Sequence, residues 1–142
     1  MDLLDAFNVS ASGLTAGRTR LHAISSNLAN AETTRTAEGG PYQRRAPVFE
    51  SRPLDPFGDA LERAVNQVHV TGIATVGGPG RRVHDPGHPD ADPEGFITLP
   101  DVDILHEMVD LMSASRSYEA NLNAMSATKD LALRALDIGG GR

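Results

Sequence analysis

The distribution of proline divides this chain of 142 residues into three parts. All nine prolines lie between Pro41 and Pro100, so both ends of the chain are free of proline. Proline removes a backbone donor and clashes with the preceding helical turn, so long helices are confined to the two ends. Nine of the fourteen glycines also fall within residues 31–100. The sequence therefore predicts a helix at each end and an irregular middle segment between them.

The first proline-free part, residues 3–30, places apolar side chains at alternating spacings of three and four residues. The stripe consists of Leu4, Phe7, Ala11, Leu14, Arg18, Leu21, Ser25 and Leu28. This spacing is typical of a helix that packs along a heptad seam. Gly13 and Gly17 lower the intrinsic helix propensity. We therefore expect a helix that needs a packing partner to form.

The last proline-free part, residues 102–137, has the same periodicity. Its stripe consists of Ile104, Met108, Leu111, Ser115, Tyr118, Leu122, Met125, Lys129, Ala132 and Leu136. Pro100 and Asp101 are a start signal for this helix, and the glycines at 139–141 are expected to end it. The two stripes fit either a helix pair closed within one subunit or seams that contact neighbouring subunits.

The middle part is typical of short strands joined by turns. We expect an extended segment at 41–49, a strand rich in β-branched residues within 65–76, and further strands at 81–84 and 96–99. The predicted fold class is α+β: long N- and C-terminal helices form an antiparallel coiled-coil-like layer, with a small β-rich middle unit. We place the boundaries at 1–32, 33–100 and 101–142.

No set of residues in the sequence assembles into a catalytic site. The absence of Cys excludes disulfides, thiolate catalysis and Cys-based zinc sites. His84, His88, Asp90 and Asp92 are conceivable metal ligands, but a loop this rich in Pro and Gly is better explained by turn hydrogen bonds. His106 and Glu107 lack the second His of a zincin, which favours a solvated helix face. We predict no enzyme, no metal and no cofactor.

Charge and hydropathy narrow the class of partner. The net charge of -6, without a basic face, argues against nucleic acid. No run of 18 apolar residues could span a membrane, and the N-terminus lacks the basic and apolar regions of a cleaved signal peptide. These exclusions favour a protein that acts by binding other protein subunits. Repeated seam contacts would give a helical filament or tube, whereas a seam closed within one subunit would give a soluble two-helix adapter.

Several blocks of the sequence resemble one known family. Residues 12–15 and 26–33 resemble the N-terminal signature of flagellar rod, hook and related axial proteins, and Ser-Asn-Leu-Ala-Asn at 26–30 is its most specific part. Residues 42–49, 85–100 and 102–121 resemble blocks of the proximal-rod members of that family. Residues 50–80 depart from the family's pattern.

The resemblance implies a subunit of the proximal rod of the bacterial flagellar basal body, which transmits torque and surrounds the export channel. It implies contacts with copies of itself, with other rod proteins and with the rod-to-MS-ring adapter, and secretion by the flagellar type III export apparatus without a cleaved signal. The expected subunit-interface residues are Phe7, Leu14, Leu21, Asn27, Leu28, Asn30, Met108, Leu111, Arg116, Tyr118, Leu122 and Met125. Phe57 and Leu61 resemble an export-docking signal of rod and hook substrates.

Overall fold

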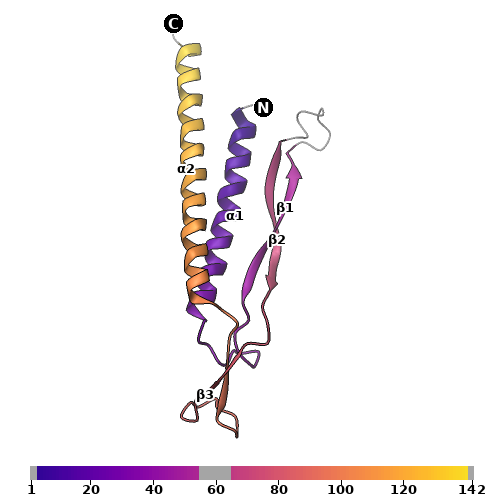
Figure 1. Cartoon of the computed structure of the whole chain (residues 1–142). Coiled ribbons are helices and arrows are strands. Elements are labelled where there is room, and N and C mark those ends of the chain that lie inside the picture. The colour runs from indigo at the N-terminus through magenta and orange to yellow at the C-terminus, as the bar shows by residue number, and fades with distance from the viewer. Residues whose placement is uncertain (1–2, 55–64, 141–142) are drawn as a thin grey trace. The chain divides into compact units, whose positions relative to one another are not determined.

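A computed structural model describes residues 3–54 and 65–140 of the chain. Helix α1 spans Leu3–Ala29 and helix α2 spans Ile104–Gly140 (Figure 1). Both predicted terminal helices are confirmed. Asp103 caps α2, because its Oδ1 accepts the N–H of His106 at 3.1 Å. The expected stop at the glycine triplet is wrong, since α2 continues to Gly140. Glycine lowers helix propensity but, unlike proline, keeps its backbone donor.

Within the described residues, four strands form two separate two-stranded sheets. Strand β1 (Arg45–Pro53) pairs with β2 (Asn66–Thr75), and β3 (Arg81–His84) pairs with β4 (Phe96–Leu99). The second pair is antiparallel, with Arg81 opposite Leu99 and His84 opposite Phe96. The predicted strands at 81–84 and 96–99 are therefore confirmed. The α+β class is confirmed as well: two long terminal helices with small β-sheets between them in the sequence.

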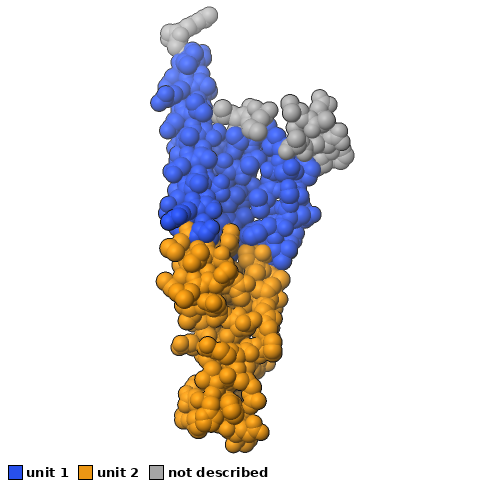
Figure 2. Space-filling view, viewed as in Figure 1, with its two compact units in different colours: residues 1–19, 48–72, 113–142 blue, residues 20–47, 73–112 orange. Residues whose placement is uncertain are grey.

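The chain forms two compact units, which Figure 2 distinguishes by colour. Unit 1 contains residues 1–19, 48–72 and 113–142. Unit 2 contains residues 20–47 and 73–112. Each unit therefore includes one portion of α1 and one portion of α2. No helix in the described part of the chain is long and apolar enough to cross a membrane.

The two helix portions pack in an antiparallel manner within each unit. In unit 1, a Cβ built on Gly13 would lie 2.8 Å from Asn121 Nδ2, and one built on Gly17 would lie 3.3 Å from Tyr118 Cδ2. In unit 2, Arg20 Nη2 lies 3.4 Å from Asp110 Oδ1, and Asn27 Nδ2 donates to Glu107 Oε2 at 3.1 Å. The partner number on α2 falls as the number on α1 rises, which is the signature of antiparallel helices.

The buried face of α1 is not the stripe of large apolar residues that periodicity indicates. The fully buried residues of α1 are Ala16, Ala23, Ile24 and Asn27. Leu4 lies on the predicted stripe, yet 68% of it is exposed. The helix contact inside the chain is thus made mainly by small and polar side chains, which allow the backbones to approach closely. Ile24 is a large apolar side chain that is buried, whereas Leu4 is exposed and Phe7, Leu14, Leu21 and Leu28 stay partly exposed.

Candidate functional site

The amide of Asn27 lies at the centre of a buried polar cluster in unit 2. Its Nδ2 donates to the carbonyl of Arg45 at 2.9 Å and to Glu107 Oε2 at 3.1 Å. Its Oδ1 accepts the N–H of Arg45 at 2.9 Å and the hydroxyl of Tyr42 at 3.0 Å. A side-chain amide offers two donors and two acceptor lone pairs, so all four positions are used. Asn27 therefore connects α1 to β1 and to α2.

Glu107 completes this cluster from the first turn of α2. It is 1% exposed, and its Oε1 accepts from Nε and Nη2 of Arg44 at 2.6 and 2.5 Å. A buried carboxylate requires a cation and further hydrogen bonds to offset its lost hydration, and Arg44 and Asn27 supply them. The interpretation of Glu107 as part of a solvated helix face is wrong. We call Asn27, Tyr42, Arg44, Arg45 and Glu107 the polar junction.

Asp110 lies one turn after Glu107 on α2, at the edge of the polar junction, and forms ion pairs there. Its carboxylate lies 3.4 Å from Arg20 Nη2 on α1 and 3.9 Å from Arg44 Nη2. His106 Nε2 lies 3.7 Å away and adds a charge only when protonated. These side chains are partly exposed, so each pair contributes little on its own. Together with Glu107 they place two acids against two arginines.

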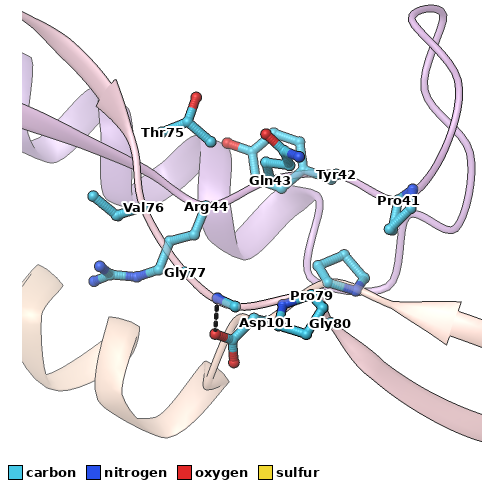
Figure 3. Close-up of a pocket in the computed structure, with 12 residues that line it drawn as sticks. Pro41, Tyr42, Gln43, Arg44, Thr75, Val76, Gly77, Pro79, Gly80 and Asp101 are labelled. Atoms are coloured by element: carbon cyan, nitrogen blue, oxygen red, sulfur yellow. Dashed lines mark hydrogen bonds between the residues drawn. The ribbon is translucent and has the colours of Figure 1, made fainter.

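A groove of about 230 Å³ lies beside the polar junction in unit 2 (Figure 3). Residues 41–44, 75–80 and 100–101 line it. Gly78 N–H donates to Asp101 Oδ2 at 2.6 Å, which attaches the connection between β2 and β3 to the segment that precedes α2. Gly77 has a φ of 119°, a conformation that favours glycine at this turn. The hydrogen bond between Gly78 and Asp101 therefore fixes the backbone conformation beside the groove.

The loop between β3 and β4 is organised by Asp92. Its Oδ1 accepts the N–H groups of Phe96 at 2.8 Å and Glu94 at 3.0 Å, and its Oδ2 accepts from Arg82 Nη2 at 2.7 Å. These bonds, above all that from the Phe96 N–H, hold the pKa of Asp92 below its ordinary value. Hydrogen bonds within the turn therefore account for the position of the Asp92 carboxylate, and a metal ion is not needed to explain it.

The other candidate ligands of this loop are also engaged in chain contacts. Asp90 Oδ2 accepts from Thr34 Oγ1 at 2.7 Å, and the Asp90 N–H donates to His88 Nδ1 at 3.1 Å. His84 packs edge-on against Phe96, with the ring centroids 5.0 Å apart. Within the part of the chain that the structure describes, no group of three His, Asp or Glu is placed to hold a metal ion.

The start of α2 exposes an apolar face. Five large residues lie there with exposed fractions between 46% and 76%: Ile104, Leu105, Met108, Val109 and Met112. Their spacing of one, three or four residues places them on one side of the helix, away from the buried Glu107 and Ala114. We call these five residues the α2 apolar face. Exposed apolar side chains gathered on one side of a helix make this face a candidate interaction site.

The predicted interface residues fall into three groups by exposure. Met108, Leu122 and Arg116 are exposed, and Asn27 is buried in the polar junction. The half-buried residues are Phe7, Leu14, Leu21, Leu28, Asn30, Leu111, Tyr118 and Met125. Asn30 Nδ2 caps α1 by donating to the carbonyl of Ser26 at 2.9 Å. Phe57 and Leu61 lie outside the described residues.

The sequence indicates Asn27 as an interface residue but does not reveal its partners. The structure pairs Arg44 with Glu107 and Asp110, which no local sequence pattern indicates. Glu107 is separated from Asn27 by 80 positions, so no local pattern connects them. The only available signal was the acid at a helical position between apolar residues, which also fits a favourable interaction with the helix dipole.

Comparisons with known proteins agree with this architecture. Residues 7–35 match the family "Flagella basal body rod protein", and residues 94–138 match "Flagellar basal body rod FlgEFG protein C-terminal". The chain is 43% identical to the flagellar basal-body rod protein FlgC of Bacillus subtilis, over 98% of this chain and 99% of the relative. It is 40% identical to FlgC of Borreliella burgdorferi, over 97% and 98%.

A third relative, FlgC of Salmonella typhimurium, is 37% identical over 98% of this chain and 99% of its own. Each of these matches thus extends over nearly the full length of both chains. The chain belongs to the FlgC family of flagellar basal-body rod proteins, which are structural subunits and not enzymes.

Proposed function

We propose that this rod subunit assembles into a helical tube through the large apolar side chains that its helices leave exposed. The α2 apolar face carries this proposal. Its five residues are about half exposed or more, while half of the buried residues described in the two helices are alanines. Contacts repeated between unlike surfaces, with a rotation that does not close, produce a tube. Burial of these side chains between subunits supplies the driving force for assembly.

The predicted interface residues extend this surface along both helices. On α2, Met108 and Leu122 are 51% and 47% exposed, and Arg116 is an exposed cation on the same helix. On α1, Phe7, Leu14, Leu21 and Leu28 remain half-buried after the chain's own packing. Part of each of these side chains is therefore available to a neighbouring subunit.

We place the two helical segments, 1–32 and 101–142, in an inner layer around the export channel, and residues 33–100 in an outer layer. The tube then transmits torque as part of the drive shaft. Its partners are copies of this chain, other rod proteins and the rod-to-MS-ring adapter. The resemblance of the terminal blocks to rod and hook proteins supports this arrangement.

The export route is a further element of the proposal. We infer secretion through the flagellar type III apparatus without a cleaved signal, with Phe57 and Leu61 as the docking signal. The test measures secreted protein for Phe57→Ala, with Phe49→Ala as the matched control in β1. Secretion should fall only for Phe57→Ala. Equal secretion by both variants would remove the docking proposal and leave the rod function untouched.

Charge on the α2 apolar face tests the assembly proposal. Val109→Asp places a carboxylate where 59% of an apolar side chain is exposed in the monomer. The variant is expected to fold as the parent does and to abolish swimming in cells that lack their own copy of the gene. Ser117→Asp, at an exposed position of the same helix away from the α2 apolar face, is the control and should swim normally. Normal swimming with Val109→Asp would contradict the proposal and favour a two-helix adapter that stays monomeric.

A further inference from the structure

We propose that the polar junction is a register lock, which fixes the alignment of α1 against α2. The polar junction excludes alternative alignments of the two helices. Its net contribution to the free energy of unfolding is no larger than that of apolar side chains of similar size. The inference concerns one subunit and does not depend on how subunits assemble. It stands on the geometry of Asn27, Arg44 and Glu107.

The polar junction can be satisfied in a single alignment. Asn27 uses all of its donors and acceptors, and two of its bonds go to the backbone of Arg45. A slip of α1 by one turn would place Ala23 or Ala31 where Asn27 now lies. Glu107 would then lose the amide donor, and the Arg45 backbone would lose both side-chain bonds. A buried polar group without a partner is costly, so the slipped alignments are disfavoured.

The remainder of the helix contact distinguishes the alignments less sharply. Gly13 and Gly17 are one turn apart, and each approaches a side chain of α2 closely. A slip of one turn puts one glycine in the place of the other and keeps one of the two close approaches, while Val9 or Leu21 enters the other position. The buried residues Ala16 and Ala114 carry only a methyl side chain. Small residues thus permit close packing, whereas the buried amide and carboxylate are satisfied together in one register, as a buried Asn fixes the register of coiled coils.

The register has a direct consequence for the outer surface. One helical turn is about 5.4 Å, so a slip would move the exposed side chains of one helix past those of the other by that distance. A surface composed of residues from both helices would then no longer match a partner. The polar junction therefore specifies the outer surface while lying beneath it.

Engineered disulfides can report the register, because the chain contains no Cys. A Cβ built on Gly17 lies 3.7 Å from Tyr118 Cβ, which is the separation found in disulfides. The pair Gly17→Cys with Tyr118→Cys therefore reports the native alignment. Gly17→Cys with Leu122→Cys, or with Ala114→Cys, reports a slip of one turn in either direction. Each pair is introduced into the full-length chain, oxidised, and quantified by mass spectrometry.

The test compares these pairs in the parent and in an apolar variant, Asn27→Leu with Arg44→Met and Glu107→Leu. In the parent, only the native pair should form a disulfide. In the apolar variant, the helical signal in circular dichroism should persist, while the ratio of slipped to native disulfide rises by about tenfold or more. Asn30→Leu, which removes an amide of the same sequence block outside the polar junction, should leave the ratio unchanged.

Two results would overturn the register lock. The first is an apolar variant that forms only the native disulfide, because the small-residue contact would then be sufficient to define the alignment. The second is an apolar variant that loses its helical signal, because the polar junction would then be a source of net stability. An equal rise in slipped disulfide for Asn30→Leu would contradict the assignment to the polar junction.

Discussion

The helices contact each other by different means in the two units of the chain. In unit 1, glycines at positions 13 and 17 of α1 face Asn121 and Tyr118 of α2 so closely that a Cβ on each glycine would lie 2.8 and 3.3 Å from these side chains. In unit 2, Asn27 and Glu107 meet through hydrogen bonds, supported by Arg44. The first contact is close and uses two glycines that lie one helical turn apart. The second depends on one buried amide and one buried carboxylate among the described residues.

This difference shows how a chain with few buried large apolar residues can have a defined structure. The buried hydrophobic residues are mostly alanines, and many leucines, valines, isoleucines and methionines remain exposed. Large apolar side chains inside the subunit would normally define its packing. Here we attribute part of that role to the polar junction, which leaves the large side chains available for contacts between subunits.

Removal of the Glu107 side chain should lower the free energy of unfolding more than the other substitutions described below. Glu107→Ala leaves Arg44 and Asn27 without their acceptor in a buried site, so the free energy of unfolding should fall by about 3–5 kcal/mol. Urea denaturation of the full chain measures it. Glu119→Ala, at an exposed position of α2, is the control and should change this free energy by less than about 0.5 kcal/mol. Equal effects of the two substitutions would show that the polar junction contributes no more than a surface site.

A bulky side chain at Gly17 should have the second largest effect. Gly17→Val places branched carbons against Tyr118, where a single Cβ already lies 3.3 Å from the ring, so the free energy of unfolding should fall by about 1–3 kcal/mol. Gly72→Val in β2 is the control, because a Cβ there meets nothing within 4 Å and strands favour β-branched residues. If Gly17→Val were as stable as the parent, the close approach in unit 1 would be absent in solution.

The smallest effect should come from Asp92, in the loop of unit 2. Its folded-state pKa lies below the ordinary value of 3.8, so it stabilises the fold above about pH 4. That stabilisation is lost as the pH falls through the folded-state pKa. Asp92→Asn removes the charge and should lower the thermal unfolding midpoint at pH 6.

The difference in midpoint between parent and Asp92→Asn should shrink as the pH falls below about 4, because the parent carboxylate then becomes protonated. The measurement is the unfolding midpoint of both proteins from pH 6 to pH 2. A difference that stays constant over this range would mean that the hydrogen-bond geometry, and not the charge, accounts for the role of Asp92. The contrast between the two units would be unaffected.

The sequence predicts the elements of this fold well, because local signals determine them. Proline confines the helices to residues outside 41–100, and β-branched residues indicate the strands at 66–75, 81–84 and 96–99. These signals act over a few residues and need no knowledge of the tertiary structure. The end of α2 was missed because Gly139 and Gly140 weaken a helix without blocking it.

The polar junction could not be predicted in the same way. The helical stripes of Leu, Phe and Met indicate an apolar seam, but the structure places Ala16, Ala23 and Asn27 on the buried side of α1. Periodicity identifies the face where large side chains gather and cannot tell whether a subunit uses that face itself. The bond between Asn27 and Glu107 joins residues far apart in the sequence, which a single sequence does not reveal.

An image of the assembled basal body at side-chain resolution tests the central claim most directly. The claim is that the subunit closes its own helix contact with small and polar residues and keeps its large apolar residues for its neighbours. We expect Leu105 and Val109, which are 76% and 59% exposed in the single chain, to be covered by adjacent subunits. If both side chains face solvent in the assembled rod, the α2 apolar face is not an assembly surface and the account is contradicted.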